Sequence, residues 1–155
     1  MMKKLLSAVL LSLALSASCL AAGASERFAA EEKAADAMVA AITGNTVAYE
    51  QVSKSFNSEL GKTMTEANFT KLRNDIKKNI GTVRNPDFVL LNKQYSLKQG
   101  YNGIDELVYM GSAGKDRVAR IAIIFALEKG APKISGIVAT PVDLAPQAPA
   151  PADKK

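Results

Sequence analysis

The sequence predicts an α+β domain in which three N-terminal helices pack on one face of a four-stranded antiparallel meander sheet. Two observations lead to this fold class. Apolar residues recur at helical spacing up to Gly81 and at every second position after it. The segments that alternate are joined by short connections containing glycine, which favour antiparallel neighbours. Residues 25–141 are expected to form this single domain.

Each expected helix carries an apolar stripe on one side, so each should lie on something larger than itself. The first covers residues 26–43 with Ser25 as its cap, and Gly44 ends it. The third begins after Thr65 and ends at Gly81. The second helix is short, opens at Asn45 or Thr46, and is followed by a turn over residues 57–62. The three stripes, in chain order, are Phe28, Ala35, Val39 and Ile42; Tyr49, Val52 and Phe56; and Phe69, Leu72, Ile76 and Ile80.

The expected strands cover residues 88–97, 104–110, 118–127 and 134–140. The third strand is the most informative, because its two sets of alternating residues differ in character. One set is fully apolar and should face the helices, while the other is mixed and indicates a more exposed face or a contact surface. The apolar set is Ile121, Ile123, Phe125 and Leu127, and the mixed set is Val118, Arg120, Ala122 and Ile124.

The first 24 residues have the pattern of a secretory signal peptide. Two lysines precede an apolar run from Leu5 to Leu15, which is too short to span a bilayer stably. Small residues follow, so cleavage is expected after Ala21, Ala22 or Ala24. We therefore expect a periplasmic or secreted protein with no transmembrane helix in its mature chain.

Cys19 leaves a second interpretation open, in which the protein is a membrane-anchored lipoprotein. Lipoproteins are cut just before a cysteine that then carries the lipid. Ala17 and Ser18 suit the two preceding positions, but Ser16 stands where leucine is usual. Lipidation of Cys19 would tether the same domain to a membrane through acyl chains.

The residue inventory excludes several classes of function. The chain has no histidine, and its only cysteine lies in the expected leader, which excludes histidine-based triads and cysteine nucleophiles from the mature protein. No metal-ligating constellation is found, so neither a metal nor a cofactor is expected. Removing the leader lowers the net charge from +5 to +3, and the scattered cations argue against a nucleic-acid partner.

Arg73, Tyr95 and Tyr109 are the candidate ligand-binding residues. Arg73 falls about 55° from the centre of the third helix's apolar stripe, where a guanidinium at the rim of a groove could hold a carboxylate or phosphate. Tyr95 and Tyr109 could orient a ligand on the concave side of the sheet. Each has a simpler alternative: an arginine stem covering the core, and aromatic residues packing in strands.

The acidic residues of the second strand are not expected to act as a catalytic pair. Asp105 and Glu106 are adjacent on a strand, so their side chains point to opposite faces. No catalytic residue is therefore assigned. A cluster of cations could attract an anionic surface, although charge on a helix normally marks its solvated side. These cations are Lys71, Lys77, Lys78 and Arg84.

From Pro141 onward proline alternates with alanine, and residues 142–155 are expected to form a disordered tail. This tail lacks a periodic apolar face.

Several local patterns together resemble a small bacterial domain family of unknown function, found in secreted proteins and sometimes ahead of an α/β-hydrolase. They are Gly44-Asn45 after an alanine-rich helix, Tyr49, Val52 and Phe56, Met64-Thr65-Glu66, and Ile80-Gly81. That family is similar to the nuclear-transport-factor-2-like and cystatin-like folds. The resemblance covers residues 34–141 and implies helices on the concave side of a curved sheet, with no catalytic signature.

The function expected from the sequence is an exported, non-enzymatic module that binds a small ligand, a peptide or an envelope protein. Two alternatives stay open. One is a small enzyme of the isomerase or lyase type that uses the same cavity, and the other is an envelope lipoprotein with a structural role.

Overall fold

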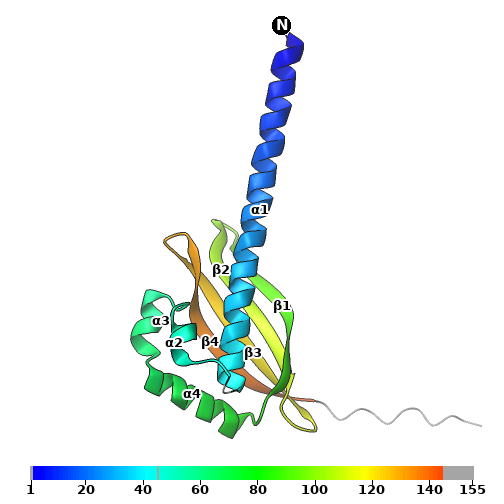
Figure 1. The fold of residues 1–155 in the computed structure, drawn as a ribbon. Coiled ribbons are helices and arrows are strands. Elements are labelled where there is room, and N and C mark those ends of the chain that lie inside the picture. The colour runs from blue at the N-terminus through cyan, green and yellow to red at the C-terminus, as the bar shows by residue number, and fades with distance from the viewer. Residues whose placement is uncertain (1, 45, 145–155) are drawn as a thin grey trace, which may run out of the picture.

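The computed structural model describes residues 2–44 and 46–144, with side chains from residue 23 onward. Four helices lie against a four-stranded antiparallel sheet in the order β1-β2-β3-β4 (Figure 1). This confirms the α+β architecture and the meander. The elements are α1 (Met2–Thr43), α2 (Tyr49–Ser53), α3 (Ser58–Thr63), α4 (Glu66–Asn79), β1 (Arg84–Ser96), β2 (Gly100–Ser112), β3 (Arg117–Glu128) and β4 (Ala131–Asp143).

Helix α1 is longer than predicted, because it begins at Met2 rather than near Glu26. The segment before Gly23 is rich in leucine and alanine, both strong helix formers, so no residue there interrupts the helix. Ser25 therefore lies inside α1 and is not its cap. In Figure 1 the blue half of α1 extends away from the sheet and the cyan half crosses it. Within the described residues, no helix is both long and apolar enough to cross a membrane.

The segment expected as a turn at residues 57–62 forms the short helix α3. The side chain of Asn57 caps it by accepting a hydrogen bond from the backbone N–H of Leu60 at 2.8 Å. Six residues make fewer than two turns, too short for an apolar stripe to show in the sequence. Thr65 caps α4 as predicted, accepting from the N–H of Asn68 at 3.3 Å, and Gly81 follows the helix with φ of 112°. Asn45, where α2 was expected to open, lies outside the described residues.

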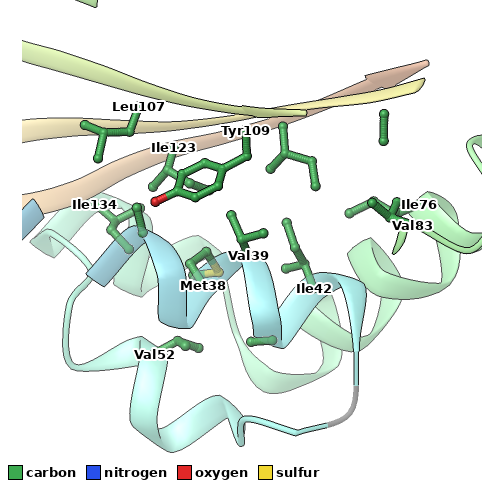
Figure 2. Close-up of a cluster of buried hydrophobic side chains, with 14 of the residues drawn as sticks. Met38, Val39, Ile42, Val52, Ile76, Val83, Leu107, Tyr109, Ile123 and Ile134 are labelled. Atoms are coloured by element: carbon green, nitrogen blue, oxygen red, sulfur yellow. The ribbon is translucent and has the colours of Figure 1, made fainter. Parts of the chain in front are cut away.

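The hydrophobic core lies between α1 and the sheet, and α1 is covered on its other side by α2 (Figure 2). Met38, Val39 and Ile42 of α1 are buried there, and each such side chain contributes about 1.5–3 kcal/mol when it leaves water. The predicted helical stripes supply most of the helical part of this core. The sheet contributes Leu107, Tyr109, Ala119, Ile121, Ile123, Phe125 and Ile134.

The third strand presents its two faces largely as predicted. Ile121, Ile123 and Phe125 are buried against the helices. Leu127 is an exception, 46% exposed; it lies close to the β3–β4 turn, where the hairpin projects beyond α2 and α3 (Figure 1). On the opposite face Ala122 is buried, although the described helices all lie on the other side of the sheet. The other members of the mixed set, Val118, Arg120 and Ile124, are half-buried.

All four strands extend beyond their predicted bounds; β2 begins at Gly100 rather than Ile104, and β3 is one residue longer at each end. β1 starts at Arg84, four positions early, because Gly111 on β2 lets the incoming chain approach closely. A Cβ on Gly111 would lie 2.7 Å from Cγ1 of Val83. β4 continues to Asp143, whose carboxylate accepts from Nε of Arg117 at 2.8 Å. Residues 142 and 143, expected in the tail, are thus part of the sheet, and the tail from residue 145 lies outside the described residues.

Candidate functional site

A groove of about 670 Å³ lies between the C-terminal end of α1, the start of α2 and the length of α4. Ile42, Phe69 and Ile76 form part of its apolar floor, and these side chains belong to the core described above. Polar side chains of α4 line its wall, including Thr70, Arg73, Asn74 and Lys77. Clefts of this size that combine apolar and polar lining are typical of small-molecule and peptide sites.

Arg73 lines this groove because of its position on α4. It lies between Phe69 and Ile76, which are both turned into the core, so its own side chain emerges at the rim and is half-buried. No ion pair or hydrogen bond holds the Arg73 side chain among the residues that the structure describes. A guanidinium in this position keeps its five donors available to a ligand.

Charge is segregated along the groove. Glu66 stands at the start of α4, whereas Arg73 and Lys77 lie in its C-terminal half. The rise of an α-helix separates Glu66 from Lys77 by about 16 Å along the axis. Glu50, on α2, adds a second carboxylate to the lining. The groove therefore offers cations at one end of α4 and a carboxylate at the other.

The structure does not bring the three candidate ligand-binding residues together. Tyr95 lies near the end of β1, is 70% exposed and packs beside Tyr101 with ring centroids 5.6 Å apart. Tyr109 is buried between β2 and α1, where its hydroxyl donates to Oδ1 of Asp36 at 2.6 Å. Burial, followed by the Asp36 carboxylate, raises the pKa of Tyr109. Only Arg73 of the three lines the groove.

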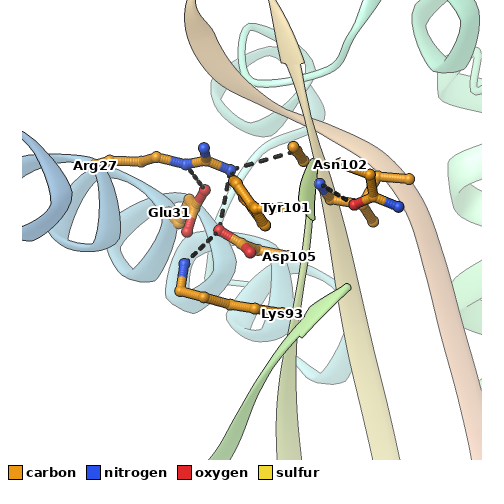
Figure 3. Close-up of polar contacts among 8 residues, drawn as sticks. Arg27, Glu31, Lys93, Tyr101, Asn102 and Asp105 are labelled. Carbon is orange, nitrogen blue, oxygen red and sulfur yellow. Dashed lines mark hydrogen bonds and ion pairs between the residues drawn. The ribbon is translucent and has the colours of Figure 1, made fainter. Parts of the chain in front are cut away.

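A buried ionic cluster lies elsewhere, where α1 meets the β1–β2 hairpin (Figure 3). Arg27 of α1 donates through Nε to Oε1 of Glu31 at 2.8 Å and through Nη2 to Oδ2 of Asp105 at 3.0 Å. Lys93 of β1 reaches the same Oδ2 atom, also at 3.0 Å. The ring of Tyr101 completes the cluster, with the charges of Arg27 and Lys93 at 5.0 and 5.2 Å from its centroid.

Two carboxylate oxygens in this cluster lack a partner. The side chains of Glu31 and Asp105 are 0% exposed, yet Glu31 Oε2 and Asp105 Oδ1 receive no hydrogen bond within the described part of the chain. Burial raises the pKa of Glu31 above its ordinary value, and Asp105 adds to that effect, although the hydrogen bond from Arg27 opposes it. Burial, and next the neighbouring Asp105, also raises the pKa of Tyr101.

The two neighbouring acids of β2 face opposite ways, as predicted. Asp105 belongs to the buried cluster, whereas Glu106 lies on the other face of the sheet and accepts from Arg120 at 2.7 Å and from Asn92 at 3.2 Å. The hydrogen bond from Arg120 is the main cause of a lowered pKa at Glu106. The role of Asp105 in this cluster could not be predicted from the sequence, because its partners on α1 are more than 70 residues away in the chain.

The remaining candidate cations differ in their surroundings. Lys71 pairs with Asp75 at 2.7 Å, Lys77 lines the groove, and Lys78 and Arg84 are exposed. In the part of the chain that the structure describes, no three potential metal ligands lie together.

Comparisons with protein-family models, with curated proteins and with solved structures find no match to this chain. The function is therefore argued from the two sites above.

Proposed function

We propose that the protein is an exported, non-enzymatic binding domain whose groove holds a small ligand or short peptide with an anionic group. The observation that carries this proposal is Arg73, a half-buried guanidinium that lines the groove without a partner among the described residues. Lys77, one turn further along α4, adds a second cation to the same wall. A guanidinium binds carboxylate and phosphate groups through two parallel hydrogen bonds.

The charges of α4 also define the polarity of the ligand. An anionic group would contact Arg73 and Lys77, and a cationic or hydrogen-bond-donating group would lie toward Glu66. The apolar floor at Ile42 and Phe69 suits a ligand with an apolar portion between its two polar ends. A short peptide with a free carboxylate meets these conditions, as does a small zwitterion.

The export half of the proposal rests on the leader pattern in residues 1–24. Its alternative, a lipid anchor on Cys19, concerns a side chain outside those that the structure describes. Mass spectrometry of the mature amino terminus separates the two, since a chain that starts at Ser25 carries no lipid.

We also propose that the fold is of the nuclear-transport-factor-2-like or cystatin-like kind, in keeping with the small secreted family that the sequence resembles. The helices on one face of an antiparallel sheet support this assignment. Determination of related structures with the same helix and strand order would test it.

An isomerase or lyase working in the same groove is the alternative, and the geometry favours it less. Such chemistry needs a buried carboxylate or tyrosine in the groove. Glu50 and Glu66 are exposed, and the hydroxyl of Tyr49 is already committed to the carbonyl oxygen of Met64 at 2.7 Å. The two buried carboxylates, Glu31 and Asp105, do not line the groove.

The proposal is tested by titrating the protein with short peptides that differ only in a free or an amidated carboxyl end. We expect binding of the free acid alone, with amide signals of α4 shifting in NMR spectra. Arg73→Gln should weaken that binding about 10- to 100-fold, the value of a lost charge-assisted hydrogen bond. Lys78→Gln removes the same charge from an exposed position on α4 and should leave the affinity unchanged.

Equal binding of free and amidated peptides would contradict the role of Arg73. Chemical conversion of a bound compound by the purified protein would contradict the non-enzymatic part of the proposal.

A further inference from the structure

The buried ionic cluster lies apart from the groove, and none of its five residues lines that groove: Arg27, Glu31, Lys93, Tyr101 and Asp105. We propose that Glu31 and Asp105 form a proton-binding site while α1 is docked on the β1–β2 hairpin. In this site the protonated carboxyl group of Glu31 donates a hydrogen bond to the Asp105 carboxylate.

The two carboxyl groups of the cluster are unequally hydrogen-bonded. Asp105 accepts hydrogen bonds from both Arg27 and Lys93, each at 3.0 Å. Glu31 accepts only from Arg27, through Oε1, and its Oε2 atom has no donor among the described residues. A fully buried carboxylate with one bare oxygen is costly, and protonation turns that bare acceptor into a donor.

The two carboxyl groups also lie next to each other. Figure 3 shows the carboxyl group of Glu31 beside that of Asp105, both beneath Arg27. The Asp105 carboxylate repels a negative charge on Glu31 and can accept a hydrogen bond from the protonated form, and both effects raise the pKa of Glu31. A single proton held between the two carboxyl groups removes the repulsion between them and supplies the hydrogen bond.

The charged neighbours of Glu31 argue for a proton rather than a metal ion. Arg27 faces it from its own helix, and Asp105 and Tyr101 face it from β2. Lys93 of β1 contacts Asp105. A metal cation at the two bare oxygens, Glu31 Oε2 and Asp105 Oδ1, would lie beside Arg27 and Lys93 and would be repelled by both. A proton fits beside them without displacing either.

The site makes the docking of α1 sensitive to pH, with a defined sign. The pKa of Glu31 is raised in the folded protein, so folding takes up a proton at pH values between the ordinary and the raised pKa. The stabilisation from the shared proton is fully present below the ordinary pKa of glutamate. It is lost as the pH rises through the raised pKa.

The direct test is a pH titration of the glutamate side-chain carboxyl carbons by NMR in the purified protein. We expect Glu31 to titrate above the ordinary value of about 4.3 and Glu106 to titrate below it. Glu31→Gln imitates the protonated form, so its unfolding equilibrium constant should lose the pH dependence that Glu31 contributes. The unfolding constants of the variant and the native chain should diverge about tenfold for each pH unit between the pKa of Glu31 in the unfolded chain and that in the folded chain.

Glu106→Gln is the matched control, one position along β2 on the other face of the sheet. Its pKa is lowered, so its contribution is present above the ordinary pKa and is lost as the pH falls. The two variants should therefore alter the pH dependence of stability in opposite directions. If Glu31 titrates at or below the ordinary value, it holds no extra proton for the site and the proposal is overturned, whether or not Glu31→Gln folds.

Discussion

Two arginines, Arg27 of α1 and Arg73 of α4, differ in what surrounds them. The guanidinium of Arg27 is held by Glu31, Tyr101 and Asp105, so the protein itself supplies its partners. The guanidinium of Arg73 lines an open groove and has no partner among the described residues. An arginine with protein partners contributes to the fold, whereas one that faces a cleft is available to a ligand.

The comparison extends to the carboxylates near each arginine. Glu31 and Asp105 are fully buried beside Arg27, and removing its guanidinium would leave Glu31 Oε1 without a donor and Asp105 with Lys93 as its one cation among the described residues. Glu66 and Glu50 near Arg73 are exposed, so water solvates them in the absence of any ligand. Replacing the arginine by glutamine should therefore lower the stability of the protein at Arg27 and its affinity for a ligand at Arg73.

The largest effect is expected from Arg27→Gln, which should lower the free energy of unfolding by about 3–5 kcal/mol near neutral pH. The loss should shrink as the pH falls, because protonated Glu31 has less need of a cation. Urea unfolding at several pH values measures both features. Arg117→Gln is the control: it breaks an exposed pair with Asp143 and should cost no more than about 1 kcal/mol. A cost as small as that for Arg27→Gln would show that the cluster does not stabilise the fold.

A smaller effect is expected from Gly111→Ala, which acts on the groove and not on the cluster. The added Cβ would lie 2.7 Å from Val83, a residue of the groove wall, and overpacking of this kind costs about 1–3 kcal/mol. Thermal unfolding and ligand titration should both register the change, while the NMR signals of Arg27 stay in place. Gly61→Ala, on α3 with no atom within 4 Å of the new Cβ, should instead stabilise the protein slightly. Shifted signals at Arg27 in Gly111→Ala would mean that the two sites are coupled.

The parts of the fold that depend on local pattern were predictable from the sequence. The helical spacing of Ala35, Val39 and Ile42 identified the face of α1 that is buried, because that spacing follows from the helix geometry alone. The angular position of Arg73 likewise placed it at a rim. The length of α1 could not be predicted, since cap signals at Ser25 compete with good helix formers on both sides.

The ionic cluster was missed because its members are distant in the chain. The contact of Glu31 with Asp105 depends on how the β1–β2 hairpin meets α1. One signal was nevertheless present: Asp105 stands at the same alternating positions as Leu107 and Tyr109, both of which face the core. A charged residue in an inward-facing position of a strand requires a buried partner. The spacing of Arg27 and Glu31, four residues apart on one helix, supplied that partner.

A modest effect is expected from Tyr109→Phe, which removes the hydrogen bond to Asp36 and keeps the ring in the core. The loss should be about 1 kcal/mol, the net value of one hydrogen bond, because exposed Asp36 regains water. Tyr95→Phe changes an exposed hydroxyl and should leave the unfolding midpoint unchanged. Neither variant should alter ligand affinity, which calorimetry can check. A loss of binding in either would place the ligand on the sheet and away from Arg73.

The smallest effect on stability is expected from Arg73→Gln, the counterpart of Arg27→Gln. No described group depends on this guanidinium, so the free energy of unfolding should change by less than about 0.5 kcal/mol. The same urea unfolding at neutral pH, run on both variants, gives the comparison without any knowledge of the ligand. A loss of several kcal/mol in Arg73→Gln would mean that its side chain stabilises the fold in solution, and the groove would then have no free guanidinium to offer. An unchanged stability together with a lost affinity would identify the arginine that the fold can do without as the one that binding requires.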